Sequence, residues 1–360
     1  MEWVFENLSF TFEPLKTEAY LMNNNNTISD KTIKSLKSLL SSPKRILLTT
    51  HKSPDGDAIG SSLALYLYLK SMGHDVTVSV PDDMPGFLKW MPGSDDILIF
   101  AKHKKSFEEK LNNAEIVFAL DYNHFKRTGN EMEKLLTSSN ALKIMIDHHQ
   151  SPDDFMKYRV WDVMASSTAQ LVWDFIVALS GKKAVDKIIG ECLYTGIMTD
   201  TGSFRFTTCT AHTLRITADL LELGVRGDLI HQRVYDQNSL NRIHLMGYAL
   251  EKIVLMPEYY TAYISLSKEE LKKFNYQPGD TEGLVNKVLS VKGVNVAALI
   301  TEKENQVRMS LRSVGDFSVN QFSRTYFNGG GHEHAAGGIL EMNLDEALMY
   351  FEEAVKKGYK

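Results

Sequence analysis

The chain has 360 residues, a formal charge of −5, a hydrophobic fraction of 43% and a charged fraction of 24%. These values are typical of a globular protein large enough for two cores, and the acidic balance argues against a protein that coats long nucleic acid. With only two cysteines, no apolar run of membrane-spanning length and no signal-peptide pattern, we expect a cytoplasmic protein without disulfides or membrane contact.

In chain order, residues 1–30 contain an asparagine run and are expected to form a flexible tail. Short apolar runs then alternate with amphipathic segments that have helical spacing. Such alternation predicts an α/β fold with a parallel sheet. The predicted strands are 45–50, 75–80, 116–120 and 142–146, and the predicted helices are 58–72, 166–179, 185–198 and 211–223.

The C-terminal part has a different pattern, in which strands follow one another more directly and a smaller α+β unit is predicted. Its predicted strands are 259–266, 294–300 and 306–312, and its predicted helices are 319–327 and 345–356. We therefore divide the chain into a tail over 1–30, a catalytic domain over 31–224, a helical linker over 225–250 and a substrate-binding domain over 251–360.

Polar side chains follow several of the predicted apolar segments. Because ligands of parallel sheets bind beyond the carboxyl ends of the strands, we expect these side chains to converge. Carboxylates and imidazoles are ligands for divalent metals such as Mn²⁺, and metal pairs are common in phosphate ester hydrolysis. Taken alone, an Asp-Gly-Asp turn or an aspartate after a strand is usually only a turn former. The candidates are His51, Asp55, Asp57, Asp121, Asp147, His148, His149 and Asp200.

A glycine-rich segment, Gly329-Gly330-Gly331-His332, follows the predicted helix 319–327. Successive glycines allow a phosphate or a base to approach the backbone closely, although a purely structural turn has the same appearance. Arg312, at the end of a predicted strand, is a candidate phosphate ligand, while a lone arginine is more often a surface residue.

The ordered motifs His51-x-x-x-Asp55-x-Asp57, Asp121, Asp147-His148-His149, Asp200 and Gly329-Gly330-Gly331-His332 resemble the DHH phosphoesterase superfamily. The C-terminal part resembles its DHH-associated substrate-binding domain. The length and the two-domain plan are similar to the bacterial oligoribonuclease A group, which comprises nanoRNases and phosphatases of 3′-phosphoadenosine-5′-phosphate. The match covers about residues 30–355.

The resemblance implies a role for each matching position, with two Mn²⁺ ions, or Mg²⁺ or Co²⁺, as the cofactor. One ion would be held by His51, Asp55 and Asp121, and the other by Asp57, Asp121, His148 and Asp200. His149, Asp57 and Asp121 would act in catalysis, and Asp147 would orient a ligating imidazole. Arg312, Gly330, Gly331 and His332 would bind the substrate. Gln170 stands where the family commonly has a glutamate, so one charge is lost there, and His334 has no assigned role.

The resemblance therefore predicts a hydrolase of phosphate esters that removes nucleotides from the 3′ end of short oligoribonucleotides and dephosphorylates 3′-phosphoadenosine-5′-phosphate. Its expected partners are short RNA, mononucleotides or dinucleotides, rather than long nucleic acid. A phosphodiesterase of cyclic dinucleotides or of linear pApA and pGpG, an inorganic pyrophosphatase, and a metal-dependent nucleotide-binding module without catalysis remain the alternatives. A homodimer is expected from the resemblance alone.

Overall fold

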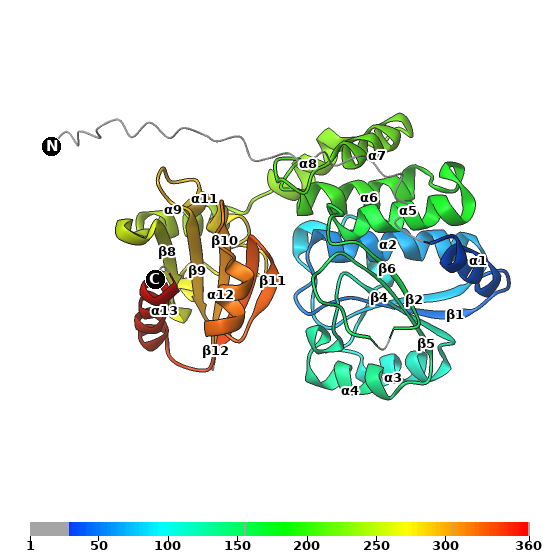
Figure 1. The fold of residues 1–360 in the computed structure, drawn as a ribbon, viewed down its shortest axis with the longest axis horizontal. Helices are drawn as coiled ribbons and strands as arrows, with labels where there is room; N and C mark the ends of the chain where they lie inside the picture. Colours follow the sequence, from blue (N-terminus) through cyan, green and yellow to red (C-terminus); the bar gives the residue numbers. More distant parts are fainter. Residues whose placement is uncertain (1–28, 155, 305, 359–360) are drawn as a thin grey trace.

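The computed structural model describes residues 29–154, 156–304 and 306–358, and these residues form two lobes, each built around a six-stranded sheet (Figure 1). The predicted flexible tail lies almost wholly outside the described residues. Only its last two positions are described, and Asp30 already belongs to the first helix. Among the described residues, no helix is both long and apolar enough to cross a bilayer.

The N-terminal lobe contains a wholly parallel sheet with the strand order β3-β2-β1-β4-β5-β6. This confirms the predicted parallel α/β fold. The strands are β1 (Arg45–Thr49), β2 (Asp75–Val80), β3 (Leu98–Ile99), β4 (Ile116–Leu120), β5 (Leu142–Asp147) and β6 (Tyr158–Trp161). The helices are α1 (Asp30–Leu39), α2 (Gly56–Ser71), α3 (Lys104–Asn113), α4 (Asn130–Ser138), α5 (Thr168–Ser180), α6 (Lys187–Asp200), α7 (Ala211–Glu222) and α8 (Gly227–Tyr235).

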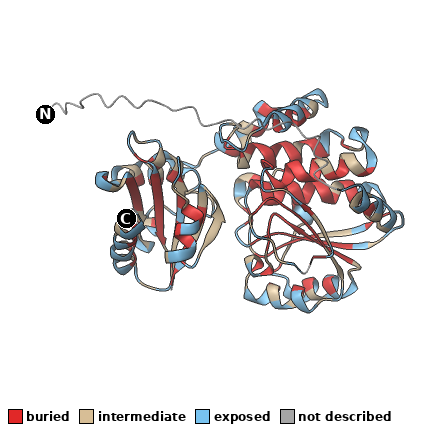
Figure 2. Ribbon diagram, in the orientation of Figure 1, coloured by how far each residue is buried: buried red, intermediate tan, exposed pale blue. Residues whose placement is uncertain are grey.

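Helices cover both faces of this sheet, and the alternation of side chains along each strand fills two separate cores (Figures 1 and 2). In β1, Ile46 and Leu48 pack toward α2, α5 and α6, while Leu47 packs toward α3 and α4. Because both faces are buried, the strands read as continuous apolar runs, which is the pattern that made them recognisable in the sequence.

Helices α2 and α6 pack so closely that only glycine fits at their contact. A Cβ atom at Gly60 would lie 2.6 Å from the backbone oxygen of Cys192, and one at Gly196 would lie 2.9 Å from Oδ1 of Asp57. This approach brings the C-terminal end of α6, and with it Asp200, to the N-terminal end of α2.

The C-terminal lobe contains a mixed sheet with the order β11-β12-β10-β9-β8-β7, in which only the β8–β9 pair is parallel. The predicted α+β unit and its hairpin are thus present. Its strands are β7 (Val254–Met256), β8 (Thr261–Leu266), β9 (Val296–Glu302), β10 (Val307–Ser313), β11 (Gly330–His332) and β12 (Ala335–Leu340). Its helices are α9 (Leu240–Glu251), α10 (Lys268–Lys273), α11 (Leu284–Leu289), α12 (Val319–Tyr326) and α13 (Leu344–Gly358).

The two helices of the predicted linker pack on different lobes. Ile230 and Val234 of α8 belong to the core of the N-terminal lobe, whereas Leu245 and Ala249 of α9 belong to the core of the C-terminal lobe. The chain therefore crosses between the lobes within residues 236–239. The domain limits proposed from the sequence remain predictions.

Candidate metal centre

The candidate ligands lie at the carboxyl edge of the parallel sheet, as their positions after strands predicted. His51 follows β1, Asp121 follows β4, and Asp147 is the last residue of β5. Asp121 adopts a left-handed backbone conformation with φ of 63°, which aspartate tolerates better than most residues. Its backbone N–H donates to Ile146 and its carbonyl oxygen accepts a hydrogen bond from Arg127, so the strained turn is held on both sides.

Asp121 lies between two groups of candidate ligands. Its Oδ2 is 3.3 Å from Nε2 of His51, and its Oδ1 is 3.6 Å from Nε2 of His148. The first group comprises His51, Asp55 and Asp121, and the second comprises Asp57, Asp121 and His148. One carboxylate therefore faces both groups, each with a different oxygen, which is the arrangement expected of a residue that bridges two cations.

Asp200 lies beside the second group. Its Oδ2 is 3.5 Å from Nε2 of His148, while Oδ2 of Asp57 is 3.8 Å from the same nitrogen. The N-terminus of α5 holds Asp57 in place, because the backbone N–H groups of Thr168 and Ala169 donate to its two oxygens at 2.6 and 2.9 Å. The side chain of Thr168 also donates to Oδ1 of Asp121 at 2.9 Å.

The donor atoms fit a divalent cation. The two candidate ligand imidazoles are anchored through Nδ1, His51 to the carbonyl oxygen of Lys52 and His148 to that of Ala165, so each directs Nε2 at carboxylates. The separations of 3.3–3.8 Å are too long for good hydrogen bonds. Ligand atoms that share one cation at about 2.1 Å lie about 3.0–3.5 Å from one another, close to this spacing.

The buried carboxylates have strongly perturbed acidities. Burial, together with the charges of Asp121 and Asp200, raises the pKa of Asp57 well above its usual value. Burial raises the pKa of Asp200 to about 7, although the charge of His148 opposes this shift. For Asp121, burial acts in the same direction, but the close approach of His51 and the charges of the neighbouring histidines outweigh it and hold the pKa far below its usual range. Such crowding of negative charge favours cation binding.

Asp147 contacts a different imidazole from the one anticipated. Its Oδ1 accepts a hydrogen bond from Nδ1 of His149 at 2.7 Å, whereas the ligand candidate His148 is anchored by Ala165. The structure therefore pairs Asp147 with His149 and not with His148, because these histidines point in different directions from adjacent positions, and the role of Asp147 as the partner of a ligating imidazole stays a prediction. Asp147 instead orients the candidate catalytic His149.

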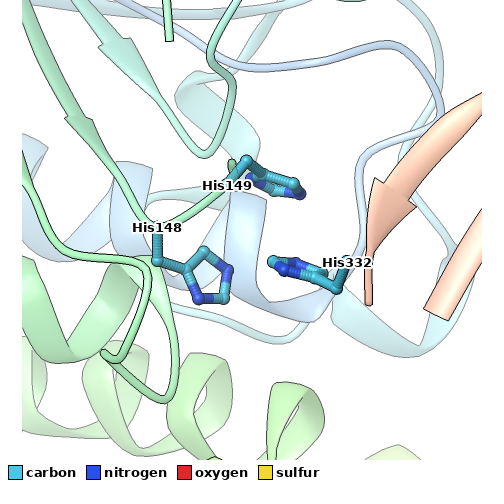
Figure 3. Close-up of side chains that lie close together, drawn as sticks. All are labelled: His148, His149 and His332. Carbon is cyan, nitrogen blue, oxygen red and sulfur yellow. The ribbon is translucent and has the colours of Figure 1, made fainter. Parts of the chain in front are cut away.

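His332 reaches this centre from β11 in the C-terminal lobe, and Figure 3 shows its ring facing those of His148 and His149. Its ring centroid is 4.3 Å from that of His149, with an interplanar angle of 26°, and 4.6 Å from that of His148. Burial, helped by the charge of His148, lowers the pKa of His332 to about 3. The second lobe therefore contributes a neutral imidazole to the centre.

Arg312 also comes from the C-terminal lobe and is placed among acidic groups. Its charge interacts with Asp200, Glu282 and Asp55, and its Nη1 donates to the backbone oxygen of Leu311 at 3.0 Å. Sequence reasoning did not identify Glu282, which lies in an irregular polar stretch without any motif. Partial desolvation and the charge of Asp55 raise the pKa of Glu282, although this residue is still exposed.

Packing requires two of the three glycines before His332. A Cβ atom at Gly331, where φ is +150°, would lie 2.4 Å from the backbone oxygen of Ala335, and one at Gly329 would lie 1.8 Å from that of Gly337. At Gly330 the nearest atoms would be 3.6 Å away, so a Cβ atom there would make only ordinary van der Waals contacts. The segment predicted to be a turn contains strand β11, because these close approaches allow it to pair with β12.

Gln170 and His334 have structural partners. Oε1 of Gln170 accepts hydrogen bonds from the hydroxyl groups of Ser166 and Thr213 at 2.7 and 2.8 Å, so the neutral side chain ties the start of α5 to α7. Nδ1 of His334 lies 3.1 Å from the hydroxyl oxygen of Ser313.

Fold and site together define a two-lobed protein with a candidate metal centre at the carboxyl edge of its parallel sheet. The chain belongs to the DHH family: the model of the DHH family N-terminal domain matches residues 45–197, and that of the DHHA1 domain matches residues 258–357. The predicted enzyme class, a hydrolase of phosphate ester bonds, is confirmed by this membership and by the relatives described next.

Several proteins resemble this chain over most of its length. The bifunctional oligoribonuclease and PAP phosphatase NrnA of Thermus thermophilus is 32% identical, over 87% of this chain and 89% of the relative. The protein of the same name from Bacillus subtilis is 26% identical, over 84% and 91%. The crystal structure of an exopolyphosphatase-related protein from Bacteroides fragilis superposes with a TM-score of 0.88 and 39% identity, over 93% of this chain and 98% of that one.

Proposed function

We propose that this protein removes nucleotides from the 3′ end of short oligoribonucleotides and dephosphorylates 3′-phosphoadenosine-5′-phosphate (pAp) in a metal-dependent reaction. The observation that carries the proposal is the convergence of His51, Asp121 and His148 with further carboxylates around a centre that His332 reaches from the other lobe. The names of the two NrnA relatives support the substrates.

The ligand set that we propose follows the two groups around Asp121. His51, Asp55 and Asp121 would hold one ion, and Asp57, Asp121, His148 and Asp200 the other. We propose Mn²⁺, with Mg²⁺ and Co²⁺ as alternatives, because a donor set of imidazole nitrogen and carboxylate oxygen suits all three ions. When bound, the cations supply an acidified water nucleophile and neutralise charge on the phosphoryl group.

His149 is the side chain that we assign to the reacting phosphate. The carboxylate of Asp147 accepts its Nδ1–H, which fixes the ring and leaves Nε2 directed away from Asp147. A neutral Nε2 accepts a proton, and a protonated one donates a hydrogen bond to a phosphoryl oxygen. His332, stacked on His149, limits the rotation of this ring while the substrate is bound.

Arg312, Gly330, Gly331 and His332 are the proposed substrate-binding residues. Arg312 has a planar guanidinium that suits a phosphate group, and it lies within electrostatic reach of the ligand candidates Asp55 and Asp200. Packing does not require a glycine at Gly330, and the absence of a side chain there would let part of a nucleotide approach the backbone near His332. At Gly331, the close packing against Ala335 already explains why the residue is a glycine, without any contact to a ligand.

Contacts between the lobes support the preference for short substrates. Nδ2 of Asn320 donates to Oε1 of Gln150 at 2.9 Å, and Nη1 of Arg308 donates to the hydroxyl oxygen of Ser53 at 3.3 Å. Both partners in the N-terminal lobe lie within two residues of a candidate site residue. A long duplex would have to break these contacts, so we expect weak activity on duplex DNA.

The alternatives have less support. No feature of the described residues favours cyclic dinucleotides over pAp, and a binding module without catalysis would not need Asp147 to orient His149. Location in the cytoplasm and a homodimer remain predictions.

The test is a panel of substrates with purified protein: a dinucleotide RNA, pAp, cyclic di-AMP and pyrophosphate, each with Mn²⁺ and with a chelator. We expect Mn²⁺-dependent release from the first two and a loss of activity of about 10²-fold or more in His149→Ala. Activity indifferent to both the chelator and His149→Ala would refute the mechanism. Preference for pyrophosphate or cyclic di-AMP over both nucleotides would refute the substrates.

A further inference from the structure

One face of the β10–β12 pair is only partly covered, because α11 lies on this side of the sheet over β8 and β9 and reaches only as far as β10. Along β10, Val307, Met309, Leu311 and Ser313 are buried, while Ser310 is exposed and Arg308 and Arg312 are half-buried. Along β12, the residues opposite those three are Ile339, Gly337 and Ala335, and none of them is buried. The open face therefore carries two arginines separated by a floor of small side chains.

This face is continuous with the candidate metal centre. Arg312, at one end of β10, interacts with Asp200 and Asp55, and His332 of the adjoining β11 stacks on His149. Arg308, at the other end, contacts Ser53 in the loop between His51 and Asp55. Figure 1 shows β11 on the side of the C-terminal lobe that is turned toward the N-terminal lobe.

The cation of Arg308 has no acidic partner among the described residues. It forms no ion pair there, and its one side-chain hydrogen bond goes to the neutral hydroxyl group of Ser53. Lys303 is a second cation nearby. Burial and the charge of Arg308 lower the pKa of Lys303, and its ammonium lies 4.4 Å from the ring centroid of Tyr276. Positive charge without a protein counter-ion is what a phosphate chain would neutralise.

Gly337 is a glycine that the fold itself does not require. A Cβ atom there would meet only the backbone oxygen of Met309, at 3.4 Å, and its φ is not in the left-handed region. Its neighbour Gly338 differs, because a Cβ atom there would lie 2.5 Å from the side chain of Phe327. The absence of a side chain at Gly337 leaves the floor between Arg308 and Arg312 flat, which suits the close approach of a ligand backbone.

We propose that this face, defined by Arg308, Ser310, Arg312 and Gly337, is a track for the single-stranded chain of the oligoribonucleotide, and that Arg308 binds a phosphate of a nucleotide other than the one being removed. The four-residue spacing of the arginines corresponds to about 13 Å along a strand, which is beyond the reach of one phosphate group. Arg308 would therefore distinguish oligonucleotides from the mononucleotide pAp. The proposal rests on the proposed function and specifies its substrate preference.

The experiment compares a trinucleotide RNA with pAp in wild type, Arg308→Ala, Gly337→Val and the control Arg226→Ala, whose arginine is exposed and paired with Asp228. A charge-assisted hydrogen bond contributes about 1.5–3 kcal/mol, so the ratio of kcat/KM for trinucleotide to that for pAp should fall about tenfold or more in Arg308→Ala. Gly337→Val should lower the same ratio by obstructing the floor. Arg226→Ala should keep the wild-type ratio.

Binding is measured separately, with a fluorescently labelled trinucleotide and chelated metal. Loss of one phosphate contact should raise the Kd and lower the salt slope of log K by about 0.7 in Arg308→Ala. Circular dichroism and thermal unfolding show whether each variant is folded. If wild type cleaves both substrates and Arg308→Ala keeps the wild-type ratio and salt slope, the track is refuted while the proposed function stands. If wild type cleaves neither, the proposed function fails, and an unchanged salt slope refutes the track as well.

Discussion

The ring of His332 stacks on the ring of His149 at 4.3 Å, although the two residues belong to different lobes. Nδ1 of His149 donates a hydrogen bond to Oδ1 of Asp147 at 2.7 Å. The ring of His332 lies against the ring of His149 from the C-terminal lobe. The centre is therefore complete only when the lobes are together. This relationship makes the arrangement of the lobes part of the candidate active site.

Removal of the stacked ring tests this dependence. We expect His332→Ala to lower kcat/KM for pAp and for a dinucleotide by about 10²-fold, because a misplaced catalytic group typically costs that much. His332→Phe retains a stacked ring without nitrogen, so it should recover part of the loss if stacking positions His149. Steady-state kinetics of both variants decide the matter, and wild-type rates in His332→Ala would contradict it.

Metal binding should stabilise the folded protein. A cation that binds only the folded state at 100 times its Kd adds about 2.7 kcal/mol to the free energy of unfolding. We expect Mn²⁺ to raise Tm relative to chelator, and this rise to shrink strongly in Asp121→Asn, which removes the charge facing both ligand groups. Differential scanning fluorimetry provides the measurement. Asp174→Asn, which changes a carboxylate on α5 that is paired with His212, is the control and should keep the full shift.

Two glycines of the C-terminal lobe should respond oppositely to alanine. Gly331→Ala places a Cβ atom 2.4 Å from a backbone oxygen at a φ of +150°, so we expect a loss of more than about 1 kcal/mol in the free energy of unfolding. Gly337→Ala meets one atom at 3.4 Å in an ordinary strand conformation and should be neutral or slightly stabilising. Urea unfolding compares them, and equal stability of the two variants would contradict the packing explanation.

The pair His212–Asp174, which joins α7 to α5, should make stability depend on pH. The hydrogen bond to Asp174, at 2.9 Å, is the main reason that the pKa of His212 is raised above 6.5. The stabilising contribution is therefore complete below about pH 6.5 and is lost as pH rises through the higher folded-state pKa. We expect Asp174→Asn to lower Tm more at pH 5.5 than at pH 8.5. An equal or larger effect at pH 8.5 would be inconsistent with this sign.

Much of the N-terminal lobe could be predicted because its signals are local. The strands β1, β4 and β5 are continuous apolar runs, and a parallel sheet brings their carboxyl ends to one edge, so His51, Asp121 and Asp147 were expected to meet. Their proximity is observed, while their chemical roles remain proposals. The side-chain pairing was harder to foresee. His148 and His149 are adjacent and similar, and only the surrounding backbone determines which one contacts Asp147.

The residues that sequence reasoning missed depend on contacts between distant segments. Glu282 has no motif around it, and its proximity to Arg312 follows from the packing of α11 beside β10. Gln150 follows the Asp147-His148-His149 motif, and nothing in the sequence around it predicts a contact. In the structure, Asn320 of the second lobe donates a hydrogen bond to its side chain. The neutral Gln170, which departs from the family pattern, is explained by hydroxyl partners from its own helix start and from α7.

The order of residues by itself determined the class of fold, the two units and the set of metal-binding candidates, because hydrophobic periodicity and turn chemistry act over a few residues. The tertiary structure decided which oxygen of Asp121 faces which histidine, that His332 covers His149, and that Gly331 is needed for packing while Gly337 is not. These features depend on distances between segments far apart in the chain, and such distances are set by the packing within each lobe and by the contacts between the lobes.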